Sequence, residues 1–149
     1  MSLAEQHETD SIDPGLRAAI MERITRIPIF GSLGMTNLGF GPGWCRVSIP
    51  RRPGWDGIFS SLHGGILMTL ADSAAAFAIL TQSGVEERLT TTDMGIRFLA
   101  PCLSDATAFA RVIKFGRTLC PCQVDIADAA GQPVAVASVA YMRLGPAGA

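Results

Sequence analysis

The fold of this chain is decided by one stretch, HGGILMTLADSAAAFAIL at residues 63–80. From Gly64 to Leu80 it is apolar on nearly every side, which is typical of a helix surrounded by protein rather than one lying on a surface. A membrane span is the alternative. However, the stretch is roughly three residues shorter than the ~20 that a span needs, and it carries Asp72 near its centre. The sequence therefore predicts a buried helix around which the rest of the chain is arranged.

Downstream of this helix the sequence changes to a two-residue period. An alternation over residues 89–98 places apolar side chains such as Met94 on one face and polar ones such as Thr91 on the other. Consecutive strands joined by short turns pair antiparallel. Three further segments with strand character follow, at residues 104–115, 118–127 and 133–143, with turns at 115–117 and 128–131.

Upstream of the central helix the chain begins with a polar, acidic segment. Residues 1–12 are expected to form a disordered tail. Asp13 followed by Pro14 is typical of a helix start, and the apolar spacing that follows predicts a helix over about residues 14–27. Pro28 is expected to end that helix.

The segment between the two helices completes the fold class. Residues 29–50 have a strand-like pattern with a glycine-rich turn around Pro42, and residues 51–62 are expected to form a loop. The order is thus helix, strands, buried helix, then about four strands. This order predicts one α+β domain over residues 13–149, with an antiparallel sheet long enough to wrap the central helix.

The composition favours a domain that associates with itself. Apolar residues make up 48% of the 149 residues and charged residues only 17%. Few charges on so small a body indicate that another subunit covers part of the apolar surface. A sheet curled around one helix also leaves open edges, so we expect a homodimer with no membrane association.

Charge and cysteines narrow the function classes. The net charge is −1 with no long basic run, which argues against nucleic-acid binding, whereas a few local arginines would suffice for coenzyme A. Cys120 and Cys122 could form a CxC metal or redox pair, but two free thiols on a packed strand face is the better interpretation. With no metal site and no signal peptide, we expect a cytoplasmic protein.

Asp72 is the residue that points to chemistry, because it is the one charged residue in Gly57–Ala76. Burying an unpaired carboxylate costs several kcal/mol unless it is hydrogen-bonded or neutralised. Keeping it in an apolar helix indicates a functional task. The alternative is a structural aspartate bonded to the neighbouring hydroxyls of Thr69 and Ser73.

The start of the same helix supplies a second chemical feature. The first backbone N–H groups of a helix lack internal partners, and the absence of a side chain at Gly64 and Gly65 lets a ligand oxygen approach them. Such donors suit a carbonyl oxygen that gains charge during acyl transfer. Gly64 and Asp72 are roughly 12 Å apart on one helix, too far to share one carbonyl. Two antiparallel copies across a two-fold axis would bring them together.

Four segments of this chain resemble the hotdog-fold thioesterases: His63-Gly64-Gly65 with Asp72, residues 92–101, Gly116-Arg117, and residues 128–131. The branch they resemble most is the phenylacetate-pathway (PaaI-like) branch of the 4-hydroxybenzoyl-CoA thioesterase superfamily. The resemblance covers roughly residues 30–143. It implies a hotdog fold, dimers that usually pair into tetramers, and hydrolysis of acyl-CoA with no cofactor beyond the coenzyme A of the substrate.

The resemblance also implies roles for residues of the central helix. The family's oxyanion donor falls on the Gly64 amide, and its nucleophile or general base falls on Asp72. His63, with Gly65, matches the element that shapes the loop and holds the thioester. Which of its two roles Asp72 takes is left open by the sequence.

Two further positions concern the attacking water. The resemblance places a water-orienting hydroxyl on Thr91, or on Thr90 or Thr92 if the loop is shifted. The family often has asparagine six residues before the histidine, where this chain has Gly57. Either the adjacent Asp56 substitutes for it or that function is absent.

The remaining expectations concern the contacts with the substrate and the functions that compete with hydrolysis. Arg117 is a candidate for the phosphates of coenzyme A. Trp55, Ile58 and Phe59 of the 51–62 loop are candidates either for an acyl pocket with an apolar or aromatic guest or for the core. The alternative functions are a non-catalytic acyl-CoA-binding module and an acyl-CoA hydratase or dehydratase. The latter chemistry generally needs a histidine paired with a carboxylate.

Overall fold

The central helix predicted from the sequence is present as α3, which runs from Gly64 to Ser83. The structure is a computed structural model that describes residues 10–148 of the 149. The other helical elements are α1 (Pro14–Thr25), α2 (Pro28–Leu33) and the short 3-10 turn η2 (Pro53–Trp55). The strands are β1 (Thr36–Gly41), β2 (Trp44–Ile49), β3 (Glu87–Phe98), β4 (Ala106–Val112), β5 (Leu119–Ala127) and β6 (Pro133–Pro146).

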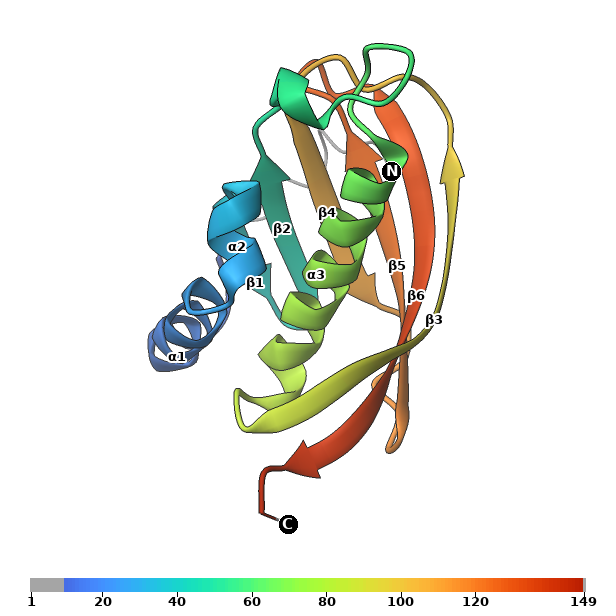
Figure 1. The fold of residues 1–149 in the computed structure, drawn as a ribbon. Helices are drawn as coiled ribbons and strands as arrows, with labels where there is room; N and C mark the ends of the chain where they lie inside the picture. The colour runs from blue at the N-terminus through green and yellow to red at the C-terminus, as the bar shows by residue number, and fades with distance from the viewer. Residues whose placement is uncertain (1–9, 149) are drawn as a thin grey trace.

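The six strands form one antiparallel sheet in the order β1-β2-β4-β5-β6-β3. The sheet curls around α3, and α1 and α2 lie along one flank of that helix (Figure 1). β3 follows α3 in the chain but pairs with the last strand, β6, so it forms one edge of the sheet. This arrangement confirms the predicted α+β class with a curled antiparallel sheet around one long helix.

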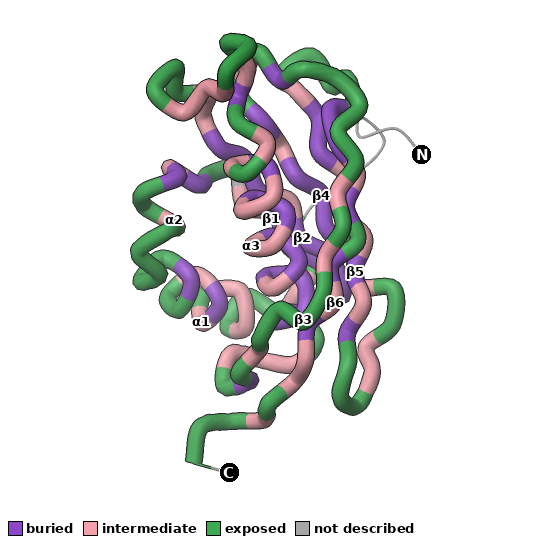
Figure 2. Tube along the Cα trace, turned by 45° about the vertical axis from the view of Figure 1, so that its right-hand side comes forward, coloured by how far each residue is buried: buried purple, intermediate pink, exposed green. Residues whose placement is uncertain are grey.

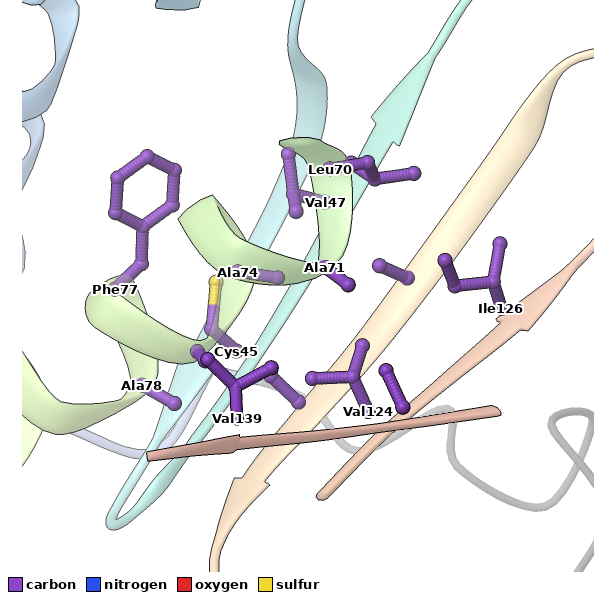
Figure 3. Packing of buried hydrophobic residues seen from close by; sticks show 14 of the residues in the cluster. Cys45, Val47, Leu70, Ala71, Ala74, Phe77, Ala78, Val124, Ile126 and Val139 are labelled. Atoms are coloured by element: carbon purple, nitrogen blue, oxygen red, sulfur yellow. The ribbon is translucent and has the colours of Figure 1, made fainter. Parts of the chain in front are cut away.

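Small side chains let α3 lie close against the sheet. Ala71, Ala74 and Ala78 are fully buried and face strand residues such as Val124 and Val139 (Figure 3). Close approach of a helix to a sheet maximises dispersion contacts, which compensates for the small area of each alanine. The core thus lies between the helix and the concave face of the sheet.

The length argument against a membrane span was wrong. α3 has 20 residues and is long and apolar enough to cross a membrane by length and composition. The apolar stretch ends at Leu80, whereas the helix continues to Ser83 and is followed by a glycine C-cap at Gly84. What identifies α3 as a core helix is its packing inside the sheet.

The segment after Pro28 differs from the prediction. It was expected to be strand-like, but Pro28–Leu33 forms α2. Proline at the first helical position has its φ already set for a helix and lacks an N–H that would have no partner there. Gly34, with φ of 64°, then ends the helix in the left-handed conformation that glycine adopts without steric cost. Pro28 therefore starts a second helix as well as following the first.

The N-terminal part of the fold begins before α1. Asp13 caps that helix, as predicted, by accepting a hydrogen bond from the Leu16 amide at 3.0 Å. The Ser11 amide donates to the Phe40 carbonyl, and the Asp10 carboxylate accepts from the Phe40 amide at 2.7 Å. Residues 10–12 therefore pack on β1, where a disordered tail was expected. Residues 1–9 of that tail lie outside the described residues.

β3 carries a bulge that changes which side chains face the helix. Thr91 pairs with Tyr141 and Asp93 with Ala140, so Thr92 is an extra residue in β3. Because of this insertion, Thr91 and Met94 both face α3. The alternation in the sequence predicts that these two residues lie on opposite faces of the strand. This prediction is wrong, because it assumes a strict two-residue period and the inserted Thr92 shifts that period by one residue. Exposed and half-buried residues run along most of β3 (Figure 2).

All four cysteines are buried and free. Cys120 and Cys122 point to the same face of β5, as the sequence indicated, and both are at most 1% exposed. Burial raises the pKa of the Cys122 thiol to about 12, and burial also raises the pKa of Cys45. These thiols are therefore protonated packing groups. Within residues 10–148 no cluster of three or more His, Cys, Asp or Glu side chains is placed to hold a metal ion.

Candidate active site

Asp72 lies in the middle of α3 and is half-buried. Its Oδ1 atom accepts two hydrogen bonds from the sheet. Thr91 Oγ1 of β3 donates at 2.7 Å, and the hydroxyl of Tyr141 of β6 lies at 2.8 Å. The register of β3 and β6 pairs these two residues directly, so one cross-strand pair presents two hydroxyls to the same carboxylate.

The structural alternative for Asp72 rested on hydroxyls of its own helix. Thr69 instead donates to the Gly65 carbonyl one turn back, at 3.0 Å. Ser73 has no hydrogen bond to Asp72 among the described residues. The carboxylate is thus fixed by strands across from the helix, which is an arrangement that helix stability alone does not require.

Tyr141 acts as a neutral donor in this group. Burial raises the pKa of its hydroxyl well above the ordinary value, and the nearby negative charge of Asp72 raises it further. The same hydroxyl lies 2.8 Å from the backbone carbonyl of Asp72. Tyr141 therefore ties β6 to α3 at the position of the carboxylate.

The two oxygens of Asp72 have different surroundings. Both side-chain donors meet Oδ1, and over residues 10–148 no donor to Oδ2 is present. Two hydrogen bonds to one oxygen fix the plane of the carboxylate and leave the other oxygen able to accept a proton or form a bond. This asymmetry suits a general base or a nucleophile.

The first turn of α3 has a distinct hydrogen-bond pattern. His63 is the N-cap, and its Nδ1 atom accepts from the Gly65 amide at 2.9 Å. The amides of Ile66 and Leu67 both donate to the His63 carbonyl. In the described part of the chain, the Gly64 amide is the one in this turn without an acceptor. Gly64 is thus the available donor at the positive end of the helix dipole, where the sequence analysis expected it.

Gly64 also lines a cavity of about 440 Å³ at this end of α3. The other lining residues are Ser61, Leu62 and Leu67, and the segment that runs from Phe98, the last residue of β3, to Cys102. A Cβ atom at position 64 would lie 2.9 Å from the Phe98 ring. The absence of a side chain at Gly64 therefore gives room both to Phe98 and to a ligand approaching the amide.

The loop before α3 differs from what the resemblance suggested. The Asp56 carboxylate is held by the Arg51 guanidinium at 2.5 Å, and the same arginine donates to the carbonyls of Ser60 and Leu103. The Asp56 carboxylate is therefore held in an ion pair with Arg51 in the loop before α3. A Cβ atom added at Gly57 would lie 3.7 Å from the His63 ring, an ordinary contact distance.

Of the remaining predicted substrate contacts, Ile58, Phe59 and Arg117 lie on the surface, whereas Trp55 packs against the core. Phe59 is 86% exposed and Ile58 89%, so neither belongs to the core. Trp55 is half-buried under the Arg52 guanidinium, 4.4 Å from its ring. Arg117 is exposed in the turn between β4 and β5.

The structure brings together some predicted residues and not others. Thr91 meets Asp72, whereas Gly64 lies at the N-terminus of the same helix, eight residues away. Of the three candidate threonines, Thr92 donates to the Ala140 carbonyl within the bulge. Tyr141 was missed by the sequence reasoning. The signal was that it is the single tyrosine of the chain, on a strand of small apolar residues.

Comparison with known proteins relates this architecture to characterised folds. The model of the Thioesterase superfamily matches residues 59–135, just over half of the chain. A solved thioesterase family protein from Silicibacter pomeroyi aligns with a TM-score of 0.80 and 24% identity, over 87% of this chain and 98% of that one. The comparison with curated proteins gives no significant match.

Two further solved structures have the same fold. The PaaI protein from the phenylacetic acid degradation operon of E. coli aligns with a TM-score of 0.83 and 22% identity, covering 91% of this chain and 98% of its own. A thioesterase from Haemophilus influenzae aligns with a TM-score of 0.76 and 22% identity, covering 84% and 88%. Likeness at this identity concerns the fold, and it confirms the predicted hotdog architecture.

Proposed function

Because the chain belongs to the thioesterase superfamily, we propose that it is an acyl-CoA thioesterase of the PaaI-like branch, which hydrolyses small or medium acyl-CoA to free acid and coenzyme A. One observation carries the proposal. Asp72 is held on one oxygen by Thr91 and Tyr141, and its other oxygen is left for chemistry. A purely structural carboxylate in this position would gain stability from partners on both oxygens.

The proposed site is completed by a second copy of the chain. Gly64 and Asp72 cannot reach one carbonyl group from the same helix, since eight residues separate them by roughly 12 Å. β3 is an open edge of the sheet, and a two-fold axis beside it would bring the α3 helix of one copy toward that of the other. We expect a homodimer with two sites, paired further into a tetramer.

The reaction follows from these positions. Asp72 Oδ2 takes a proton from water, and the water oxygen forms a bond to the thioester carbon. The carbonyl electron pair moves to its oxygen, which the Gly64 amide of the second copy stabilises. When the carbonyl re-forms, the C–S bond breaks and the coenzyme A thiolate leaves and takes up the proton that Asp72 holds, which restores the carboxylate. In the alternative route Asp72 Oδ2 attacks the thioester carbon and the C–S bond breaks, so that the coenzyme A thiolate leaves. Water then hydrolyses the mixed anhydride, which releases the acid and restores the carboxylate.

The other contacts of the proposal use the chain's own side chains. Thr91 orients the attacking water as well as the carboxylate. His63 and Gly65 set the shape of the helix start, and Arg117 meets the phosphates of coenzyme A. No metal or organic cofactor takes part in the proposed chemistry, and the reducing cytoplasm is its proposed location.

The test is thiol release from a panel of acyl-CoA substrates by the wild type and Asp72→Asn. Asparagine keeps the size of the side chain but removes the basic oxygen, so we expect kcat to fall by at least ~100-fold. Glu86→Gln is the matched control, since Glu86 is an exposed carboxylate beside β3. Undiminished hydrolysis by folded Asp72→Asn would refute the role of Asp72.

The same assay separates the competing functions. An acyl-CoA-binding module would bind the substrates without releasing thiol. A hydratase would change the acyl chain of an enoyl-CoA while its thioester stays intact. No feature of the described structure favours either of these functions over hydrolysis.

A further inference from the structure

A second cavity, of about 240 Å³, lies on the flank of α3 that faces the two N-terminal helices. From α3 it is lined by Ser73, Ala76, Phe77 and Leu80, whose spacing places them on one stripe of the helix. Opposite them stand isoleucines of α1 and α2 and the beginning of β3. We call this space the flank cavity.

The flank cavity adjoins the hydrogen-bonded group of Asp72, Thr91 and Tyr141, which we call the Asp72 group. Tyr141 lines the cavity, and its hydroxyl lies 2.8 Å from Asp72 Oδ1. Leu89, another lining residue, lies two residues before Thr91 on the same face of β3. Ser73 directly follows Asp72 in the helix. Two of the three residues of the Asp72 group are therefore next to or part of the cavity wall.

The walls of the flank cavity are predominantly apolar, and its two charged residues, Arg23 and Glu87, already make hydrogen bonds within the protein. The Glu87 carboxylate accepts from the Arg143 guanidinium at 3.0 Å and from the Gly145 amide at 2.7 Å. The Arg23 guanidinium donates to the Glu87 backbone carbonyl at 3.0 Å, which links α1 to β3. A guest would meet Ile24, Leu80 and similar side chains along its length, so the chemistry of the cavity suits an uncharged tail.

We infer that the flank cavity is the acyl pocket of the enzyme, and that Ala76 and Ile29 set the size of the acyl group it accepts. This inference rests on the proposed thioesterase function. An apolar cavity of about 150 Å³ accommodates benzene, which has six carbons, and the flank cavity, at about 240 Å³, is larger by about half. It therefore fits an uncharged acyl group of up to about eight carbons or with a single ring.

This assignment differs from the sequence-based expectation for the acyl pocket. That expectation used the 51–62 loop, but Ile58 and Phe59 project into solvent and are 89% and 86% exposed. The flank cavity instead adjoins the Asp72 group and is enclosed by α1, α2, α3, β3 and β6. The N-terminal helices, which fall outside the segment matched by the family model, thereby contribute to substrate choice.

The test compares acyl-CoA chain-length profiles of the wild type with two variants. Ala76→Leu fills the cavity, so we expect kcat/KM for octanoyl-CoA relative to acetyl-CoA to fall at least tenfold, given the discrimination of about 10–200-fold per methylene in apolar pockets. Ile29→Ala widens the cavity at a residue that is 41% exposed, and the profile shifts to longer chains. Ala18→Leu, on the exposed face of α1, is the matched control and leaves the ratio unchanged.

The outcomes distinguish this inference from the proposed function. Wild-type protein that releases thiol from no acyl-CoA overturns both. An active wild type whose ratio is unaltered in folded Ala76→Leu, or in Ile29→Ala, overturns the acyl pocket alone. A wild-type profile that keeps rising beyond about ten carbons also overturns it, because the cavity is too small.

Discussion

Asp72 is oriented from the sheet, and its two partners contribute in different ways. Tyr141 is 6% exposed, so loss of its hydroxyl partner would leave a buried polar group unsatisfied. Thr91 is exposed and can exchange its hydrogen bond with water. The tyrosine therefore contributes more to stability, and the threonine is the partner that can reorient together with water during a reaction.

This difference predicts separate effects for the two residues. Thr91→Val is expected to lower kcat between about tenfold and 100-fold, since small misplacement of a catalytic group has large effects, with little change in Tm. Tyr141→Phe is expected to lower stability by roughly 1 kcal/mol as well as kcat. Steady-state kinetics and thermal melts check both variants.

Thr91→Ser provides the control because it restores the hydroxyl without the methyl group. It should recover most of the activity lost in Thr91→Val. Full activity in Thr91→Val would show that the hydrogen bond to Asp72 has no catalytic consequence.

At the scale of the helix, the start of α3 offers a way to remove one N–H group while keeping the backbone. Gly64 is the first residue of the helix, where proline is tolerated. His63 has φ −56° and ψ 133°, a conformation that suits a residue preceding proline. Gly64→Pro therefore deletes the proposed oxyanion donor with limited effect on the helix.

We expect the kcat of Gly64→Pro to be lower than that of the wild type by about 10²–10³-fold, which is the usual effect of deleting one oxyanion donor. Gly64→Ala keeps the N–H but introduces the same contact with Phe98, whose ring is 52% exposed and can move aside. Kinetics of the two variants side by side separate the amide from the steric effect. An equal fall in kcat in both variants would show that the contact of the new side chain with Phe98, and not the loss of the amide N–H, lowers the activity.

The elements also show what can be predicted from sequence and what cannot. α3 was predicted because an uninterrupted apolar stretch after His63-Gly64-Gly65 is a strong local signal. α2 was missed because six residues give too short a pattern to separate a helix from a strand. The Thr92 bulge and the contact of Tyr141 with Asp72 depend on strand register, which is set by packing across the sheet. Local patterns thus point to Asp72 and Gly64, and the family resemblance to Thr91, whereas neither points to Tyr141.

At the scale of the whole molecule, the open β3 edge and the separation of Gly64 from Asp72 lead to one requirement. Each proposed site takes its carboxylate from one copy of the chain and its amide from another. A homodimer of Asp72→Asn has two defective sites, and so does a homodimer of Gly64→Pro. A mixed dimer has one site with both changes and one site with neither.

Mixing the two inactive variants should therefore restore activity. If subunits assort at random, half of the dimers are mixed and each has one intact site, so we expect about a quarter of wild-type activity. Co-refolding the two proteins and measuring thiol release checks this prediction. Failure to recover activity in a mixture shown to contain mixed dimers would place both groups of the site within one chain.

The burial of all four cysteines has a practical consequence for every one of these measurements. Aromatic disulfide dyes develop colour when a thiolate attacks them. The cysteine thiols of the folded protein are buried, and burial raises their pKa, so they stay protonated and do not react with the dye. The absorbance of the dye therefore measures only the thiol of the coenzyme A that is released. When the protein is denatured, the same dye reacts with all four cysteine thiols of each chain. One reagent can therefore measure both the rate of hydrolysis and, in a separate sample, the fraction of the protein that is folded.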